Sequence, residues 1–116
     1  MSPPVFSPSD SLPVPTLVLQ QQAGVWHLSC IGSPAYPGAV FSLYLEDITV
    51  PVATHHAPMT HYQAIFPVPV QEAPSAQYQC QYSALLGMEW RNSERSLPLV
   101  VFRGTVVLLV ELCPYL

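Results

Sequence analysis

Four histidines are the residues of this chain best able to hold a metal ion: His27, His55, His56 and His61. A zinc site needs about four Cys, His or carboxylate ligands that meet at one point. His55 and His56 are adjacent, so on an extended segment their side chains point to opposite sides. No cysteine or carboxylate is spaced with them to complete a tetrahedron. The sequence therefore predicts no metal site and no other cofactor.

Serine-nucleophile catalysis would need a histidine base, an orienting acid and hydrogen-bond donors for an oxyanion. Serine, histidine and aspartate all occur, but the chain has no Gly-x-Ser-x-Gly turn and no glycine-rich loop. We therefore expect no enzymatic activity.

Charged residues make up only 9% of the 116-residue chain, and the formal net charge is −4. There is no lysine, and the three arginines are Arg91, Arg95 and Arg103. Proteins that bind nucleic acid or an anionic membrane surface present a basic face. The charge pattern therefore argues against both partners.

The three cysteines, Cys30, Cys80 and Cys113, show no paired Cys-x-x-Cys spacing. In "QYQCQY" (77–82) and "VWHLSC" (25–30) apolar and polar residues alternate, which is typical of half-buried strands. Both Cys30 and Cys80 fall on the apolar, inward face of their strand. Because both cysteines face inward on their strands, we predict a disulfide between them. The alternative is that both are buried thiols in a β-sandwich that is not immunoglobulin-like.

Fourteen prolines and the scarcity of charged helix formers favour strands and turns over helices. About seven short strands alternate with turns, and the inward phases give five expected core residues: Trp26, Leu28, Phe41, Leu43 and Tyr78. In "FPVPV" (66–70) the two prolines cannot donate to a sheet ladder, so this segment is predicted to be an edge strand.

Tyr78 precedes Cys80 by two residues, the spacing of the tyrosine corner in immunoglobulin domains. Together with the cysteine phases, this predicts an all-β, immunoglobulin-like (C2-type) antiparallel sandwich of about seven strands. We expect residues 1–12 to be a disordered Ser/Pro-rich lead, 13–102 the domain and 103–116 an apolar tail.

The two ends of the chain show no targeting segment. The opening residues lack the basic start and apolar stretch of a signal peptide. The apolar run in 103–116 is shorter than a membrane-spanning helix and contains Pro114, so we expect no membrane span. This tail and the odd thiol of Cys113 are where we expect self-association.

From residue 13 to 102 the chain resembles the immunoglobulin domains of the leukocyte-receptor group, which includes leukocyte and killer-cell immunoglobulin-like receptors and the IgA Fc receptor. It is also similar to a single-domain myeloid membrane protein. The resemblance rests on "PTLVL" (15–19), "FSLY" (41–44), "IFPVPV" (65–70), "YQCQY" (78–82) and "WRNSERSLPLVV" (90–101). The chain departs from the group at Pro74 and Ala76, where an Asp-x-Gly turn is usual, and at Arg91, where a serine follows the tryptophan.

Two neighbouring segments form the candidate ligand surface. "SALLGM" (83–88) is predicted to be an uncharged loop, and its Leu85, Leu86 and Met88 either contact a ligand or fold back onto the domain. In "EWRNSERS" (89–96) we expect an arginine to stack on the Trp90 indole, a contact of roughly 0.5–2 kcal/mol. This stack, made by Arg91 or Arg95, is expected mainly to stiffen the last strand. The alternatives are that Trp90 covers Leu85 and Leu86, or that the segment contacts a ligand directly.

The resemblance implies a non-catalytic recognition module of the immune system that binds a protein ligand, located outside the cell or at the plasma membrane. One alternative is an incomplete or soluble product of such a receptor with no partner of its own. Another is a fibronectin-type cytokine-receptor module, which would not need the Cys30–Cys80 bridge.

Overall fold

The structure is a computed structural model that describes residues 12–103 of the chain. These residues form strands joined by turns, with no helix among them. The strands are β1 (Thr16–Gln22), β2 (Val25–Ile31), β3 (Val40–Leu45), β4 (Ala53–His56), β5 (Gln63–Pro67), β6 (Ser75–Leu86), β7 (Glu89–Asn92) and β8 (Leu99–Phe102).

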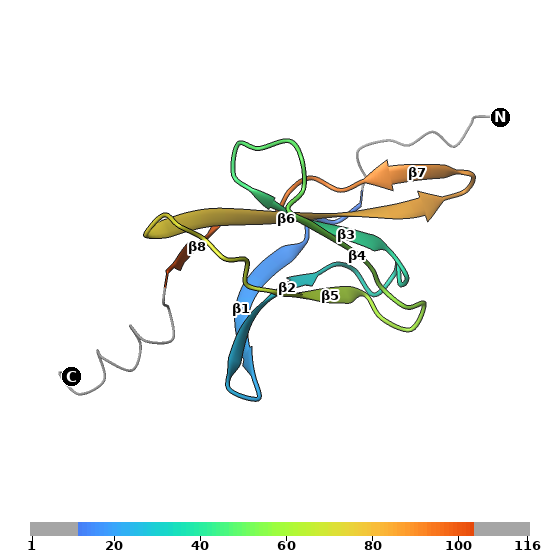
Figure 1. Cartoon of the computed structure of the whole chain (residues 1–116). Helices are drawn as coiled ribbons and strands as arrows, with labels where there is room; N and C mark the ends of the chain where they lie inside the picture. Colours follow the sequence, from blue (N-terminus) through green and yellow to red (C-terminus); the bar gives the residue numbers. More distant parts are fainter. Residues whose placement is uncertain (1–11, 104–116) are drawn as a thin grey trace.

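Two antiparallel sheets pack as the two layers seen in Figure 1. The three-stranded sheet has the order β1-β2-β5, and the five-stranded sheet has the order β4-β3-β6-β7 with β8 also paired to β6. The closing strand that the sequence predicted corresponds to β8, whereas β7 forms in a segment that we expected to be a loop, and both pair with β6. β4 pairs with β3, so β4 lies in the larger sheet. The predicted immunoglobulin-like sandwich is confirmed.

A disulfide joins Cys30 in β2 to Cys80 in β6, with the two Cα atoms 6.2 Å apart. It links the two sheets and closes a sequence separation of 50 residues. Leu43 lies beside Cys80 in the β3–β6 register, and all three side chains are fully buried. The predicted pairing of these cysteines is therefore confirmed.

The core lies between the sheets, around this disulfide. Leu28, Phe41, Leu43 and Tyr78, four of the five side chains that we expected there, are at most 1% exposed. The ring of Phe41 packs against Tyr82 with 5.6 Å between centroids. Leu12, which we assigned to the end of the disordered lead, is instead buried in the core at 6% exposed.

Trp26 is the exception, because the structure leaves it half-buried and outside the core cluster. It has the same phase in β2 as Leu28 and Cys30. However, the β1–β2 hairpin runs beyond the facing sheet (Figure 1), and its residues 20–25 are exposed. Trp26 lies next to this exposed end of the hairpin, so the correct phase does not place its side chain in the core cluster.

The Tyr78 hydroxyl donates a hydrogen bond to Oε1 of Gln71 at 2.9 Å. The Gln71 amide in turn donates to the carbonyl of Val101 in β8 at 3.0 Å. No residue between 71 and 76 has a positive φ, so the turn before β6 needs no glycine. This explains how Pro74 and Ala76 replace the usual Asp-x-Gly.

β5 pairs only with β2 among the described strands, so the predicted edge position is confirmed. The strand ends at Pro67, however, and residues 68–70 of the expected strand lie outside it. No helix within residues 12–103 is long and apolar enough to cross a membrane. The expectations for the tail and for Cys113 fall outside the described residues.

Candidate ligand-binding surface

The β6–β7 hairpin carries most of the candidate ligand residues. β6 continues through Leu86, and only Gly87 and Met88 form the turn. Gly87 has φ 66° and Met88 does not have a positive φ, the combination found in a type II′ hairpin turn. The expectation of a loop over 83–88 was therefore wrong. The alternation that begins at Gln77 continues in β6 and makes an unusually long strand.

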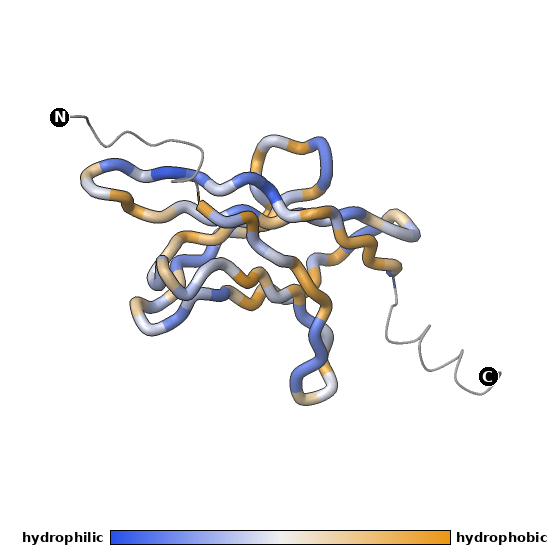
Figure 2. The backbone as a smooth tube through the Cα atoms, turned by 180° about the vertical axis from the view of Figure 1, so that it is seen from behind, coloured by the Kyte–Doolittle hydropathy of each residue, from blue (hydrophilic) through white to orange (hydrophobic). Residues whose placement is uncertain are grey.

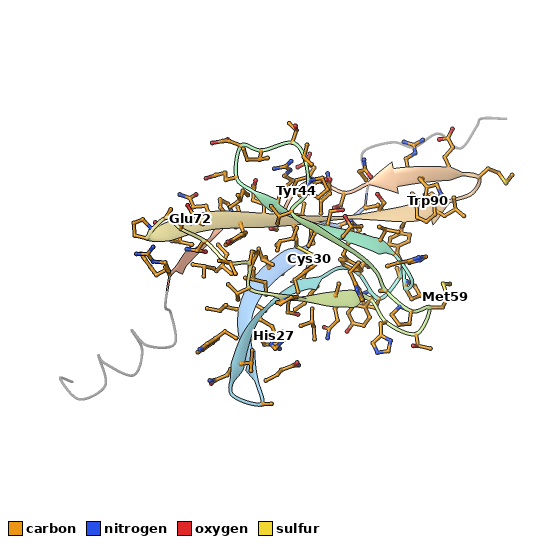
Figure 3. The ribbon with its side chains drawn as sticks, in the orientation of Figure 1. His27, Cys30, Tyr44, Met59, Glu72 and Trp90 are labelled. Atoms are coloured by element: carbon orange, nitrogen blue, oxygen red, sulfur yellow. A yellow bond between two sulfur atoms is a disulfide. The ribbon has the colours of Figure 1, made fainter. Side chains whose placement is uncertain are left out.

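Three apolar side chains gather at the end of this hairpin. Leu85 and Trp90 are direct cross-strand partners, so both lie on the outer face of the sheet. They are 53% and 56% exposed, and Met88 in the turn is 94% exposed. We call these residues (Leu85, Met88 and Trp90) the hairpin-tip surface. Figure 3 shows Trp90 at the far end of the sheet from Glu72, which lies before β6 begins.

Leu86 and Arg91 do not share this surface, because alternate residues of a strand point to opposite faces. Leu86 is half-buried and packs against the core. The Arg91 side chain is 39% exposed and forms an ion pair with Glu89 at 3.1 Å. Five of the six residues that we grouped as one candidate surface therefore belong to two faces of the hairpin, and the sixth, Arg95, lies outside it, between β7 and β8.

Arg95 has a different aromatic partner from the one that we expected. Its guanidinium carbon lies 3.7 Å from the centroid of the Tyr44 ring in β3. The same guanidinium donates a hydrogen bond to the Ile48 carbonyl at 2.8 Å. Arg95 therefore fastens the β3–β4 loop to the segment between β7 and β8, and it does not stack on Trp90. The sequence did not reveal the Tyr44 partner because this pairing joins residues far apart in the chain, whereas Trp90 lies opposite Leu85, the other contact that we expected for it.

Ser93 and Ser96 have a role that the sequence reasoning missed. They are 3% and 2% exposed and lie in the break between β7 and β8. The Ser93 hydroxyl accepts a hydrogen bond from the Tyr82 backbone N–H at 3.1 Å, and the Ser96 hydroxyl accepts one from the Cys80 N–H at 3.0 Å. The two serine hydroxyls thus take the place of the backbone acceptors that a paired strand would offer to β6. The Ser-x-x-Ser spacing was the available signal, and we had instead aligned the motif serine with Arg91.

The two buried tyrosines of β6, Tyr78 and Tyr82, have raised pKa values. Burial, with a further contribution from the neighbouring Tyr36, raises the pKa of Tyr82 to about 12. Burial also raises the pKa of Tyr78. The Tyr82 hydroxyl donates to the Pro13 carbonyl at 2.7 Å, which ties the start of the described chain to the larger sheet. Both tyrosines are therefore structural donors at neutral pH and not acid–base groups.

An open hollow of about 730 Å³ lies at the opposite end of β6, between the β3–β4 loop and residues 69–77. Its lining is mainly apolar, with Glu46 and Glu72 as the acidic groups. Among the described residues that line it there is no histidine, cysteine or arginine. The hollow therefore has the volume of a small-ligand pocket.

The four histidines are spread over separate local interactions. His56 contacts the Gly38 carbonyl at 3.1 Å, His61 the Thr60 hydroxyl at 2.8 Å and His27 the Val25 carbonyl at 3.1 Å. His55 meets the Phe66 ring edge-on, with 6.4 Å between centroids. Within residues 12–103, no group of three or more His, Cys, Asp or Glu side chains could hold a metal ion.

A family model described as the Ig domain in C19orf38 (HIDE1) matches residues 14–102. The chain belongs to this immunoglobulin-domain family. The match covers all eight strands, the Cys30–Cys80 bridge and the hairpin-tip surface. A search of curated proteins found no match to the chain.

Membership of this Ig-domain family sets the general class of function. Immunoglobulin folds generally present surfaces for recognition, and activity in them depends on sites added to the scaffold. An Ig domain with an inter-sheet disulfide is typical of proteins outside the cell or at its surface, where thiols oxidise. This Ig domain therefore has the character of an extracellular or cell-surface domain.

Proposed function

We propose that this Ig domain is a non-catalytic recognition module of an immune receptor of the leukocyte-receptor type, and that it binds a protein ligand through the hairpin-tip surface. The main support is the exposed cross-strand pair of Leu85 and Trp90, with Met88 beside it in the turn. Aromatic residues and methionine are enriched where proteins bind one another.

The position of the pair supports contact with a ligand more than a role in folding. Both side chains are more than half exposed, and their inward-facing neighbours, Ala84 and Leu86, make the core contacts of the hairpin. A tryptophan that is flanked by smaller apolar side chains can fill a pocket on a partner and supply much of the binding energy.

The proposal can be tested by displaying the full chain as a streptavidin tetramer, with its disulfide formed, over an arrayed library of cell-surface ectodomains. We expect binding to a specific ectodomain. The double variant Leu85→Ala/Trp90→Ala should weaken that binding by tenfold or more, about 1.4 kcal/mol or above.

The matched control is Val70→Ala/Leu97→Ala, which removes two apolar side chains that are 99% and 85% exposed elsewhere on the domain. This control should bind like the unaltered chain. Equal binding by the hairpin-tip variant and the unaltered chain would contradict the proposed surface. Absence of any binding ectodomain across the library would contradict the proposed function.

A further inference from the structure

The free edge of β1 is the longest strand edge left open among residues 12–103. β1 spans Thr16–Gln22 and, among the described strands, pairs only with β2. Its sequence, TLVLQQQ, contains no charged residue and no proline. Natural proteins usually protect edge strands with charges, prolines, bulges or short length, because an open edge pairs with other strands. None of these protections occurs in β1.

The other edges of the two sheets are protected. β5 ends at Pro67, and Pro69 follows it. β4 and β7 have four residues each, and β7 carries the charged pair Glu89 and Arg91. β8 also has four residues and follows the break at 93–98. Of the strand edges in the described part of the chain, only β1 would therefore offer an incoming strand an uninterrupted ladder.

The register of the β1–β2 hairpin shows which backbone groups of β1 are available. Gln22 pairs with Val25 across a two-residue turn, and such a turn is closed by a hydrogen-bonded pair. Hydrogen-bonded pairs alternate along an antiparallel ladder. The residues of β1 that direct their N–H and C=O groups away from β2 are therefore Leu17, Leu19 and Gln21.

These three residues are spaced symmetrically about Leu19, which is also the centre of the strand. If a second β1 approached in antiparallel orientation, Leu19 would pair with Leu19 of the second copy and Leu17 with Gln21. Each of these pairs would exchange both of its backbone hydrogen bonds. The absence of charge in β1 lets two copies, each with a net charge of −4, meet without direct repulsion between opposed side chains.

The shape of the hairpin leaves room for this contact. The end of the β1–β2 hairpin projects beyond the larger sheet, and Figure 2 colours its glutamine-rich end as hydrophilic. Antiparallel pairing about Leu19 places the body of the second copy beyond the hairpin end of the first. The two larger sheets therefore lie at opposite ends of the shared strand pair.

We propose that the β1 edge is a self-association surface, where two copies of the chain join their three-stranded sheets into one continuous sheet about a twofold axis at Leu19. Such an isologous contact is the commonest symmetry of protein dimers. One strand pair is a small interface, so the dimer is weak and forms at high local concentration. This surface lies on β1 and is separate from the hairpin-tip surface of β6 and β7.

The first experiment is sedimentation equilibrium of the full chain, with its disulfide formed, up to millimolar concentration. We expect a reversible dimer. Gln21→Pro removes one N–H from the free edge without breaking the β1–β2 ladder, and it should weaken the dimer at least tenfold. Gln21→Ala keeps that N–H and should associate like the unaltered chain. A chain that stays monomeric throughout, or that associates equally with proline at position 21, would overturn the proposal.

A second experiment tests the register and does not depend on the proline variant. In a Cys113→Ser background, Leu19→Cys should form a disulfide-linked dimer on mild oxidation, because hydrogen-bonded partners have Cα atoms about 5.5 Å apart, within the range of a disulfide. The matched control is Val18→Cys, whose predicted partner is Gln20. Its yield of linked dimer should be at least tenfold lower. Equal yields from the two variants would refute the twofold axis at Leu19.

Discussion

The hydroxyl of Ser96 accepts a hydrogen bond from the backbone N–H of Cys80 at 3.0 Å, and the Ser96 N–H donates to the Cys80 carbonyl at 2.8 Å. A single buried serine thus satisfies both backbone groups of one half of the disulfide. This contact lies where the last strand is interrupted, so the interruption leaves no unpaired polar group on Cys80.

We expect Ser96→Ala to lower the free energy of unfolding by about 1–3 kcal/mol, because the Cys80 N–H would lose its acceptor while remaining buried. Urea denaturation of the oxidised domain measures this loss. Ser83→Ala is the matched control, since the Ser83 hydroxyl donates to Asn92 on the exposed face. The control should change stability by less than about 0.5 kcal/mol. Similar losses in the two variants would show that the buried contact has no special role.

The disulfide gives a second prediction. Replacing both Cys30 and Cys80 by alanine should lower the free energy of unfolding by about 4 kcal/mol, because a loop of about 50 residues is no longer closed in the unfolded chain. Denaturation of the double variant beside Cys113→Ser, which keeps the bridge, measures the effect. A loss below about 1 kcal/mol would contradict the chain-entropy explanation.

The features that the sequence predicted well depend on short-range alternation. The inward phases of Cys30 and Cys80 predicted both the strands and the bridge, because a period of two assigns each side chain to a face. Pro67 and Pro69 likewise predicted an edge position, because a residue without an N–H cannot serve an inner ladder. Such features need only a few neighbouring residues.

The features that the sequence predicted poorly depend on how far one strand extends past another and on contacts between segments distant in the chain. Trp26 has the inward phase, yet it lies next to the exposed end of the β1–β2 hairpin and outside the core cluster. The Tyr44 partner of Arg95 and the β6 partners of the Ser93 hydroxyl become apparent only once strands distant in sequence are brought together. Leu85 was misassigned to a loop, because an apolar run beside a glycine does not reveal where a strand ends.

The β1–β2 turn gives a third prediction. Ala23 has φ 52° and Gly24 has φ 80°, both in the left-handed region that a type I′ turn requires. Asparagine adopts this conformation more readily than alanine, so Ala23→Asn should raise the free energy of unfolding by about 1 kcal/mol.

The opposite change at the next residue is the matched test for Ala23. Gly24→Ala should lower the free energy of unfolding by about 1 kcal/mol. Apart from the adjacent residues, no atom lies within 4 Å of the position that the added Cβ would take, so this loss would come from the backbone conformation and not from a clash. Thermal denaturation measures both variants, and a loss of stability in Ala23→Asn would contradict this account of the turn.

The last prediction concerns alkaline pH. The folded chain raises the pKa of Tyr82 from 10.0 to about 12, so the unfolded chain releases this proton first as the pH increases. Below pH 10 the contribution of neutral Tyr82 to stability is fully present. Between pH 10 and about 12 the unfolded state binds fewer protons than the folded state, and the free energy of unfolding must fall.

Urea denaturation across that pH interval, in a Cys113→Ser background to prevent thiol exchange, measures the slope. Tyr82→Phe should make the slope clearly shallower, although the raised pKa of Tyr78 leaves part of it in place. Loss of the hydrogen bond to Pro13 shifts the whole curve of this variant downward but does not change its slope with pH. An unchanged slope in Tyr82→Phe would mean that Tyr82 is not the group whose proton is held by folding.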